Sequence, residues 1–79
     1  MIMYITITIQ IEEFEYNIRI DRRQKVYMAQ KILAESGNSF ASALPDFYKS
    51  KQTNRIISAY NTFEEAGIYT GDILEAIAD

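Results

Sequence analysis

The chain has 79 residues, enough for one domain and too few for two separate cores, so we expect a single domain over residues 1–79. It contains no cysteine and no histidine, which excludes disulfides, thiolate metal sites, thiol nucleophiles and the commonest general base. The net charge is −3, and an acidic chain is repelled by nucleic acid unless its cations cluster strongly. We therefore expect no catalytic residue, no cofactor and no metal.

Two alternating runs near the N-terminus predict a β-hairpin. From Met3 to Ile11, apolar residues occupy every second position, which is typical of a strand with one buried and one exposed face. A second alternating run extends from Phe14 to Ile20, after a short polar break. Two such runs predict an antiparallel pair. The acidic cluster at and after the break, Glu12, Glu13 and Glu15, is interpreted as solvated surface charge.

The sequence period becomes helical from Arg22 to Ser36. Asp21 is the predicted N-cap, with Gln24 three residues later as in a capping box. Gly37 supplies the left-handed conformation with which helices commonly end. The predicted buried face of this helix consists of Val26, Ala29, Ile32 and Leu33.

The second half of the chain carries shorter elements. The predicted strands are Asp46–Lys51, Arg55–Ile57 and Ile73–Ile77. Phe40 and Leu44 are expected to pin the loop after the helix to the core, and Thr62 and Gly67 delimit one predicted helical turn. The element order is β-β-α-β-β-(helical turn)-β. It predicts an α+β fold with a mixed sheet of four to five strands and one main helix packed on one face.

The last third of the chain resembles ubiquitin-like proteins. The resemblance rests on Arg55-Ile56-Ile57 and on residues 61–74, where Ala66-Gly67-Ile68 precedes a Gly71-Asp72 turn and the final strand. More narrowly, the chain resembles the YukD/EsaB family of small bacterial ubiquitin-like proteins, which accompany type VII secretion systems. The resemblance implies a β-grasp (ubiquitin-like) roll and a non-catalytic, cytoplasmic accessory or regulatory protein. Its partners would be other proteins, among them secretion-system components.

A β-grasp group or sulfur carrier is the alternative function. The resemblance implies that such carriers use a C-terminal Gly-Gly, whereas this sequence ends in Ala76-Ile77-Ala78-Asp79. A bulky acidic end is not expected to thread the narrow active sites that process a Gly-Gly tail, so the carrier role is disfavoured. An RNA-binding β-grasp module is a third idea, and it is disfavoured by the net charge of −3.

We expect partners to bind the sheet face opposite the helix. If Leu74 and Ala76 face the helix, the isoleucines of the last strand face outward; a shifted register would place one of them in the core instead. The predicted partner-binding residues are Tyr4, Tyr48, Ile73 and Ile77, with Lys49, Lys51 and Arg55 as a polar rim. A free sheet edge allows strand pairing, so we expect a monomer or weak homodimer. We expect neither nucleic-acid binding nor membrane insertion.

Overall fold

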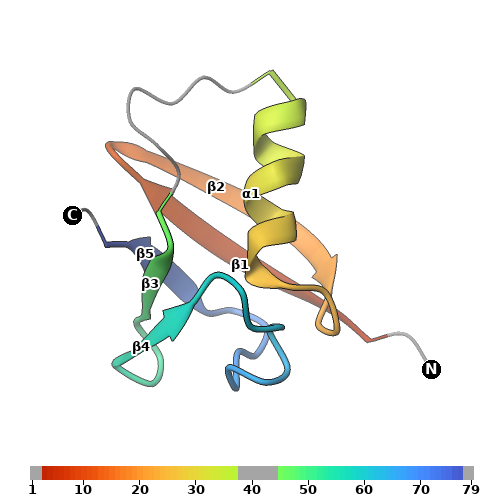
Figure 1. Cartoon of the computed structure of the whole chain (residues 1–79), viewed down its shortest axis with the longest axis vertical. Helices are drawn as coiled ribbons and strands as arrows, with labels where there is room; N and C mark the ends of the chain where they lie inside the picture. The colour runs from red at the N-terminus through yellow and green to blue at the C-terminus, as the bar shows by residue number, and fades with distance from the viewer. Residues whose placement is uncertain (1–2, 38–44, 78–79) are drawn as a thin grey trace.

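The computed structural model describes residues 3–37 and 45–77. Its elements are β1 (Tyr4–Ile11), β2 (Phe14–Asp21), α1 (Val26–Glu35), β3 (Phe47–Ser50), β4 (Arg55–Ser58) and β5 (Ile73–Ala76). The strands form one sheet in the order β2-β1-β5-β3-β4. β1 and β5 run parallel, the other neighbouring pairs run antiparallel, and α1 crosses one face of the sheet (Figure 1). The predicted α+β architecture, a mixed sheet with one helix on one face, is confirmed.

The hairpin of β1 and β2 contributes one side of the hydrophobic core. Its eight pairs run one-to-one from Tyr4 opposite Asp21 to Ile11 opposite Phe14, without a bulge. Each buried isoleucine removes apolar surface from water and contributes roughly 1.5–3 kcal/mol. The buried side chains of the two strands are Ile5, Ile7, Ile9, Ile11, Ile18 and Ile20. The period-two pattern therefore predicted the buried face of this hairpin correctly.

α1 begins later than the sequence predicted. It starts at Val26, and no side chain caps it. Asp21 accepts a backbone hydrogen bond in a turn that precedes the helix, so the predicted capping box is wrong. The amides of Val26 and Tyr27 instead donate to the carbonyls of Asn61 and Ala59, at 2.9 and 2.7 Å. Long-range backbone contacts thus satisfy donors that a helix start leaves without intrahelical partners.

One residue of the predicted helical face is misplaced. Ile32 is 39% exposed, whereas Gln30 is only 1% exposed and belongs to the core side of α1. The Gln30 side-chain amide donates to the carbonyl of Pro45 and to the hydroxyl of Tyr48, each at 2.6 Å. A polar side chain is tolerated in the core here because both of its donors are satisfied.

The predicted helical turn after β4 is confirmed. The Glu65 amide donates to Thr62 Oγ1 and the Thr62 amide donates to the Glu65 carboxylate, both at 2.9 Å. This reciprocal pair is a capping box. Gly67 ends the turn with a φ of +72°. The turn holds Phe63 in the core, where it is fully buried.

Two further expectations concern the loop after α1 and the membrane. The predicted loop anchors Phe40 and Leu44 lie outside the described residues. Within the described ranges, no helix is long and apolar enough to cross a membrane. α1 itself has 10 residues, about half of what a bilayer requires.

Candidate binding surface

The sheet face opposite α1, which we call the open face, carries alternate residues of every strand. The strand register arranges these residues in rows. One row crosses all five strands and consists of Glu15, Gln10, Glu75, Lys49 and Ile56. A parallel row includes Asn17, Thr8 and Ile73. The open face is therefore mostly polar at the hairpin and more apolar toward β3 and β4.

An apolar group is exposed where β3, β4 and β5 meet. Phe47 is 49% exposed and Ile56 is 67% exposed. The amide of Ile77 donates to the carbonyl of Phe47 at 3.1 Å, which sets Ile77, the residue after β5, beside Phe47 of β3. We call the set Phe47, Lys49, Ile56, Ile73 and Ile77 the β3/β5 patch.

The structure contradicts the predicted place of Tyr48 in this surface. Tyr48 is fully buried, and its hydroxyl accepts the hydrogen bond from Gln30. Burial raises the pKa of Tyr48 to about 12, although the Gln30 hydrogen bond acts in the opposite direction. Because side chains alternate along a strand, Phe47 and Lys49 take the outward positions and Tyr48 points inward.

Tyr4 lies on the open face but not beside the β3/β5 patch. It is 53% exposed, and the Arg19 guanidinium carbon lies 4.8 Å from the centre of its ring. The β1–β5 register begins at Thr8 opposite Ile73. Tyr4 is four residues before that point, a distance of about 13 Å along a strand. The prediction that Tyr4 adjoins the isoleucines of β5 is therefore wrong.

The last strand has the predicted phase. Leu74 is fully buried and Ala76 packs partly against the core, while Ile73 and Ile77 are half-buried. Ile73 pairs with Thr8 of the open face. The shifted register, with one of these isoleucines inside the core, is therefore excluded.

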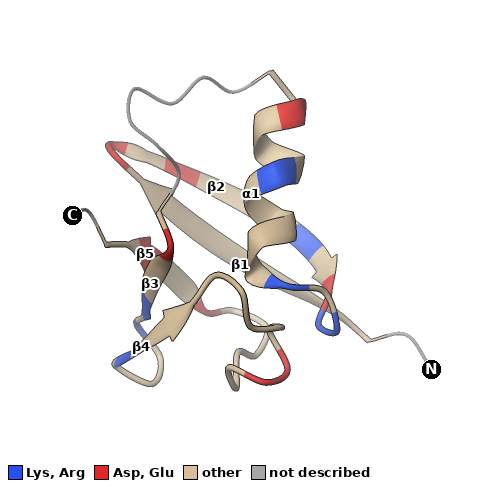
Figure 2. Ribbon diagram, viewed as in Figure 1, with Lys and Arg blue, Asp and Glu red and all other residues tan. Residues whose placement is uncertain are grey.

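The three predicted rim cations are all exposed, but Arg55 pairs with inward-facing Ser50 in the β3–β4 register, so the prediction that it borders the open face is wrong. Lys51 Nζ lies 3.5 Å from Glu75 Oε2, and Lys49 is directly opposite Glu75 in the β3–β5 register. Exposed ion pairs of this kind contribute only about 0.2–1 kcal/mol, so the cations are easily redirected to a partner. Figure 2 shows cations at the β3–β4 end of the sheet and acids at the β1–β2 turn.

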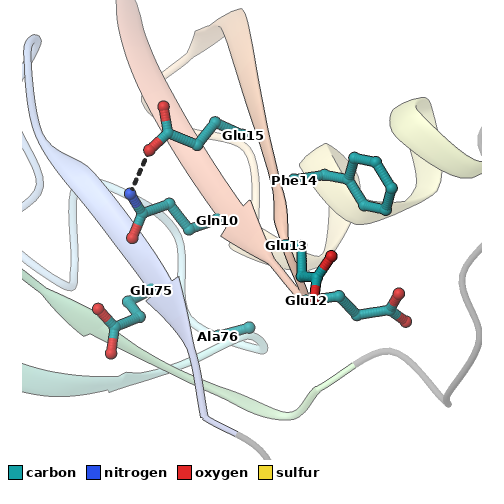
Figure 3. A pocket seen from close by; sticks show the side chains of 7 residues that line it. All are labelled: Gln10, Glu12, Glu13, Phe14, Glu15, Glu75 and Ala76. Atoms are coloured by element: carbon teal, nitrogen blue, oxygen red, sulfur yellow. Dashed lines mark hydrogen bonds between the residues drawn. The ribbon is translucent and has the colours of Figure 1, made fainter.

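An open hollow of about 380 Å³ lies at the acidic end. Its lining residues are Gln10, Glu12, Glu13, Phe14, Glu15, Glu75 and Ala76 (Figure 3). Glu15 accepts a hydrogen bond from the Gln10 side chain at 2.7 Å. The acids of the hairpin turn form a visible cluster in the sequence, whereas Glu75 joins them only because β5 pairs with β1.

The hollow offers negative charge rather than the environment of an acid–base site. All four of its glutamates are exposed to solvent, the usual state of such side chains. Among the described residues, no group of three or more His, Cys, Asp or Glu side chains could hold a metal ion. The open face thus pairs a basic, apolar end with an acidic end, an arrangement suited to orienting a charged protein partner.

The fold has a counterpart among solved structures. The solution structure of the C-terminal ubiquitin-like domain of mouse tubulin-specific chaperone e matches with a TM-score of 0.63 and 14% sequence identity. The match covers 99% of this chain and 91% of that chain. No protein-family model and no curated protein matches the chain. The chain therefore has the ubiquitin-like β-grasp fold, a roll of five mixed strands around one helix.

Proposed function

We propose that this chain is a non-catalytic ubiquitin-like module that binds another protein through its open face. The observation that carries the proposal is the β3/β5 patch, where Phe47 and Ile56 are large apolar side chains exposed by 49% and 67%. Both adjoin Lys49: Phe47 lies two residues before it in β3, and Ile56 is its partner in the β3–β4 register. Exposed aromatic and branched side chains that cluster beside polar groups are typical of protein-binding surfaces.

The narrower proposal is that this module is an accessory or regulatory component of a bacterial type VII secretion system. It is supported by the resemblance of Arg55-Ile56-Ile57 and residues 61–74 to the YukD/EsaB family. A β-grasp fold agrees with that resemblance. In this role the module acts in the cytoplasm and docks onto a secretion component.

A binding assay against purified type VII components from the same genome tests both levels of the proposal. Phe47→Ser is expected to weaken capture at least about tenfold, because a buried aromatic anchor commonly carries more than 1.4 kcal/mol of binding energy. Tyr69→Ser is the matched control, since it removes an aromatic ring that is 64% exposed but lies outside the patch. Circular dichroism verifies that both variants are folded.

The outcomes of this assay distinguish the general proposal, a protein-binding module, from the narrower assignment to type VII secretion. Equal capture by the two variants would refute the β3/β5 patch as the docking surface. If the wild-type protein binds no type VII component but still binds another protein through Phe47, the secretion assignment fails and the interaction module stands.

A further inference from the structure

The outer edge of β2 is a long strand edge, and some of its main-chain groups point away from the sheet without a backbone partner among residues 3–37 and 45–77. Thr8 donates to the carbonyl of Asp72 at 3.0 Å and Gly71 donates to the carbonyl of Thr6 at 2.7 Å, so these positions of β1 bond toward β5. The intervening isoleucines of β1 must then bond to β2. It follows that Phe14, Tyr16, Ile18 and Ile20 form the hydrogen-bonded pairs with β1.

The remaining positions of β2 direct their N–H and C=O groups away from the sheet. These positions are Glu15, Asn17 and Arg19, and within the described residues no backbone group bonds to them. Natural proteins blunt such edges with proline, a bulge, an inward charge, a very short strand or charged edge side chains, especially lysine. β2 carries the edge charges Glu15 and Arg19, which are of opposite sign, and it has no lysine. β2 has eight residues without proline, pairs with β1 without a bulge, and directs only apolar and aromatic side chains inward. β4, at the opposite edge, has only four residues.

We propose that two copies of this chain pair antiparallel along β2, about a two-fold axis at Asn17. In this register Glu15 of each copy faces Arg19 of the other, on the open face. Three outward-directed pairs then align as hydrogen-bonded pairs, and since each exchanges two bonds, about six backbone hydrogen bonds form. Glu15 and Arg19 of β2 are thus complementary to their own reverse, whereas Asp21 comes opposite Glu13 of the turn.

Two-fold axes at the other residues of β2 set fewer opposite charges against each other within the strand. Centring the axis on Arg19 places two guanidinium groups opposite each other, and centring it on Glu15 places two carboxylates opposite each other; directly opposed like charges destabilise a strand pair. Centring it on Ile18 sets Glu15 against Asp21. Centring it on Tyr16 leaves Glu15 opposite Asn17 and moves Arg19 beyond the end of the partner strand. Only the Asn17 register forms the opposite-charge pair twice within the strand.

The inner face of the edge supports the same register. Phe14 is 53% exposed, and its ring centre lies 6.3 Å from that of half-buried Tyr16. In the Asn17 register, Phe14 faces Ile20 of the second copy and Tyr16 faces Ile18. Aromatic side chains opposite branched ones are favourable cross-strand pairs. Dimerisation therefore covers aromatic surface that α1 leaves exposed.

A charge-swap series measured by sedimentation equilibrium tests this dimer, at protein concentrations up to about 1 mM because a small interface associates weakly. The wild-type protein should approach twice the chain mass of 9.1 kDa. Glu15→Arg and Arg19→Glu should each raise the dissociation constant at least about tenfold, since each opposes like charges. The double variant should restore the dimer, and a mixture of the two single variants should form a heterodimer.

A main-chain pair of variants separates edge pairing from a loss of side-chain contacts. The side chain of Asn17 accepts a hydrogen bond from Thr8 at 2.8 Å, and both Asn17→Pro and Asn17→Ala remove it. Only Asn17→Pro also removes the outward N–H, at an edge position where proline is tolerated. Dimerisation should be lost with proline and retained with alanine.

A wild-type protein that stays monomeric to about 1 mM would overturn the proposal. So would a dimer that is unaffected by both single swaps, or one that is abolished by Ile56→Lys on the β4 edge. The dimer is independent of the proposed function, because its pairing residues lie on β2 rather than in the β3/β5 patch and none of these measurements involves a secretion component.

Discussion

Alkaline pH is expected to destabilise this protein through one buried phenol, that of Tyr48. Burial raises the pKa of Tyr48 to about 12 in the folded chain, whereas a tyrosine in an unfolded chain ionises near 10. The folded state therefore holds this proton more tightly than the unfolded state. The stability contributed by the neutral phenol is complete below pH ~10 and is lost as the pH rises toward ~12.

The size of the effect follows from the difference between the two pKa values. About two units correspond to roughly 3 kcal/mol, a large share of the roughly 4–12 kcal/mol expected for a chain of this length. Tyr48→Phe removes the ionisation and with it this pH dependence. At neutral pH the variant should lose about 1–3 kcal/mol, because one buried N–H of Gln30 loses its partner while the other keeps its bond to the carbonyl of Pro45.

Urea unfolding at neutral pH and at a series of alkaline pH values measures both the cost of Tyr48→Phe and the pH-dependent loss of stability. The free energy of unfolding of the wild-type protein should fall faster than that of Tyr48→Phe above pH ~10. A difference titration of phenolate absorbance between the two proteins isolates the ionisation of Tyr48. Equal pH slopes, or ionisation of Tyr48 near pH ~10 while the protein is still folded, would refute the reasoning.

Two further predictions concern local structure. Asp72 is fully buried and accepts hydrogen bonds from the Ser50 hydroxyl and from the amides of Gln52 and Ile73. Asp72→Ala should therefore lower the free energy of unfolding, measured in urea, by about 3 kcal/mol or more. A decrease below ~0.5 kcal/mol would contradict this prediction. Glu12 adopts a φ of +58°, so Glu12→Gly should raise the thermal midpoint by relieving about 0.5–1 kcal/mol of strain, whereas Glu13→Gly should not.

The buried face of a strand could be predicted from the sequence wherever one set of alternate residues is apolar and the other set is polar. In β1, isoleucine alternates with tyrosine, threonine and glutamine, so only one phase can be buried. In β3, Phe47 and Tyr48 are adjacent aromatics in a strand of four residues. Either phase would bury an aromatic ring, and the ring that the structure buries is that of Tyr48, whose hydroxyl has a hydrogen-bond partner in Gln30 of α1. No local pattern contains that information.

Long-range pairing explains the other misses. The Asp21 and Gln24 positions fit a capping box by spacing, but the first amides of α1 are satisfied by carbonyls from Ala59 and Asn61. Similarly, Glu75 completes the acidic hollow because β5 pairs with β1. Both contacts join segments that are distant in sequence, so periodicity and capping rules could not reveal them.

The two proposed surfaces lie on different strands, and their geometry makes them compatible. Antiparallel pairing of two β2 edges requires a two-fold axis perpendicular to the sheet, so both open faces point in the same direction. With strands about 4.8 Å apart in the order β2-β1-β5-β3-β4, each β3/β5 patch lies about 14 Å from that axis. The dimer therefore presents two patches about 30 Å apart, and a partner that also contains two sites gains effective concentration for its second contact. Glu15→Arg should then weaken binding to a two-site partner and leave binding to a single-site partner unchanged, whereas Phe47→Ser should weaken both.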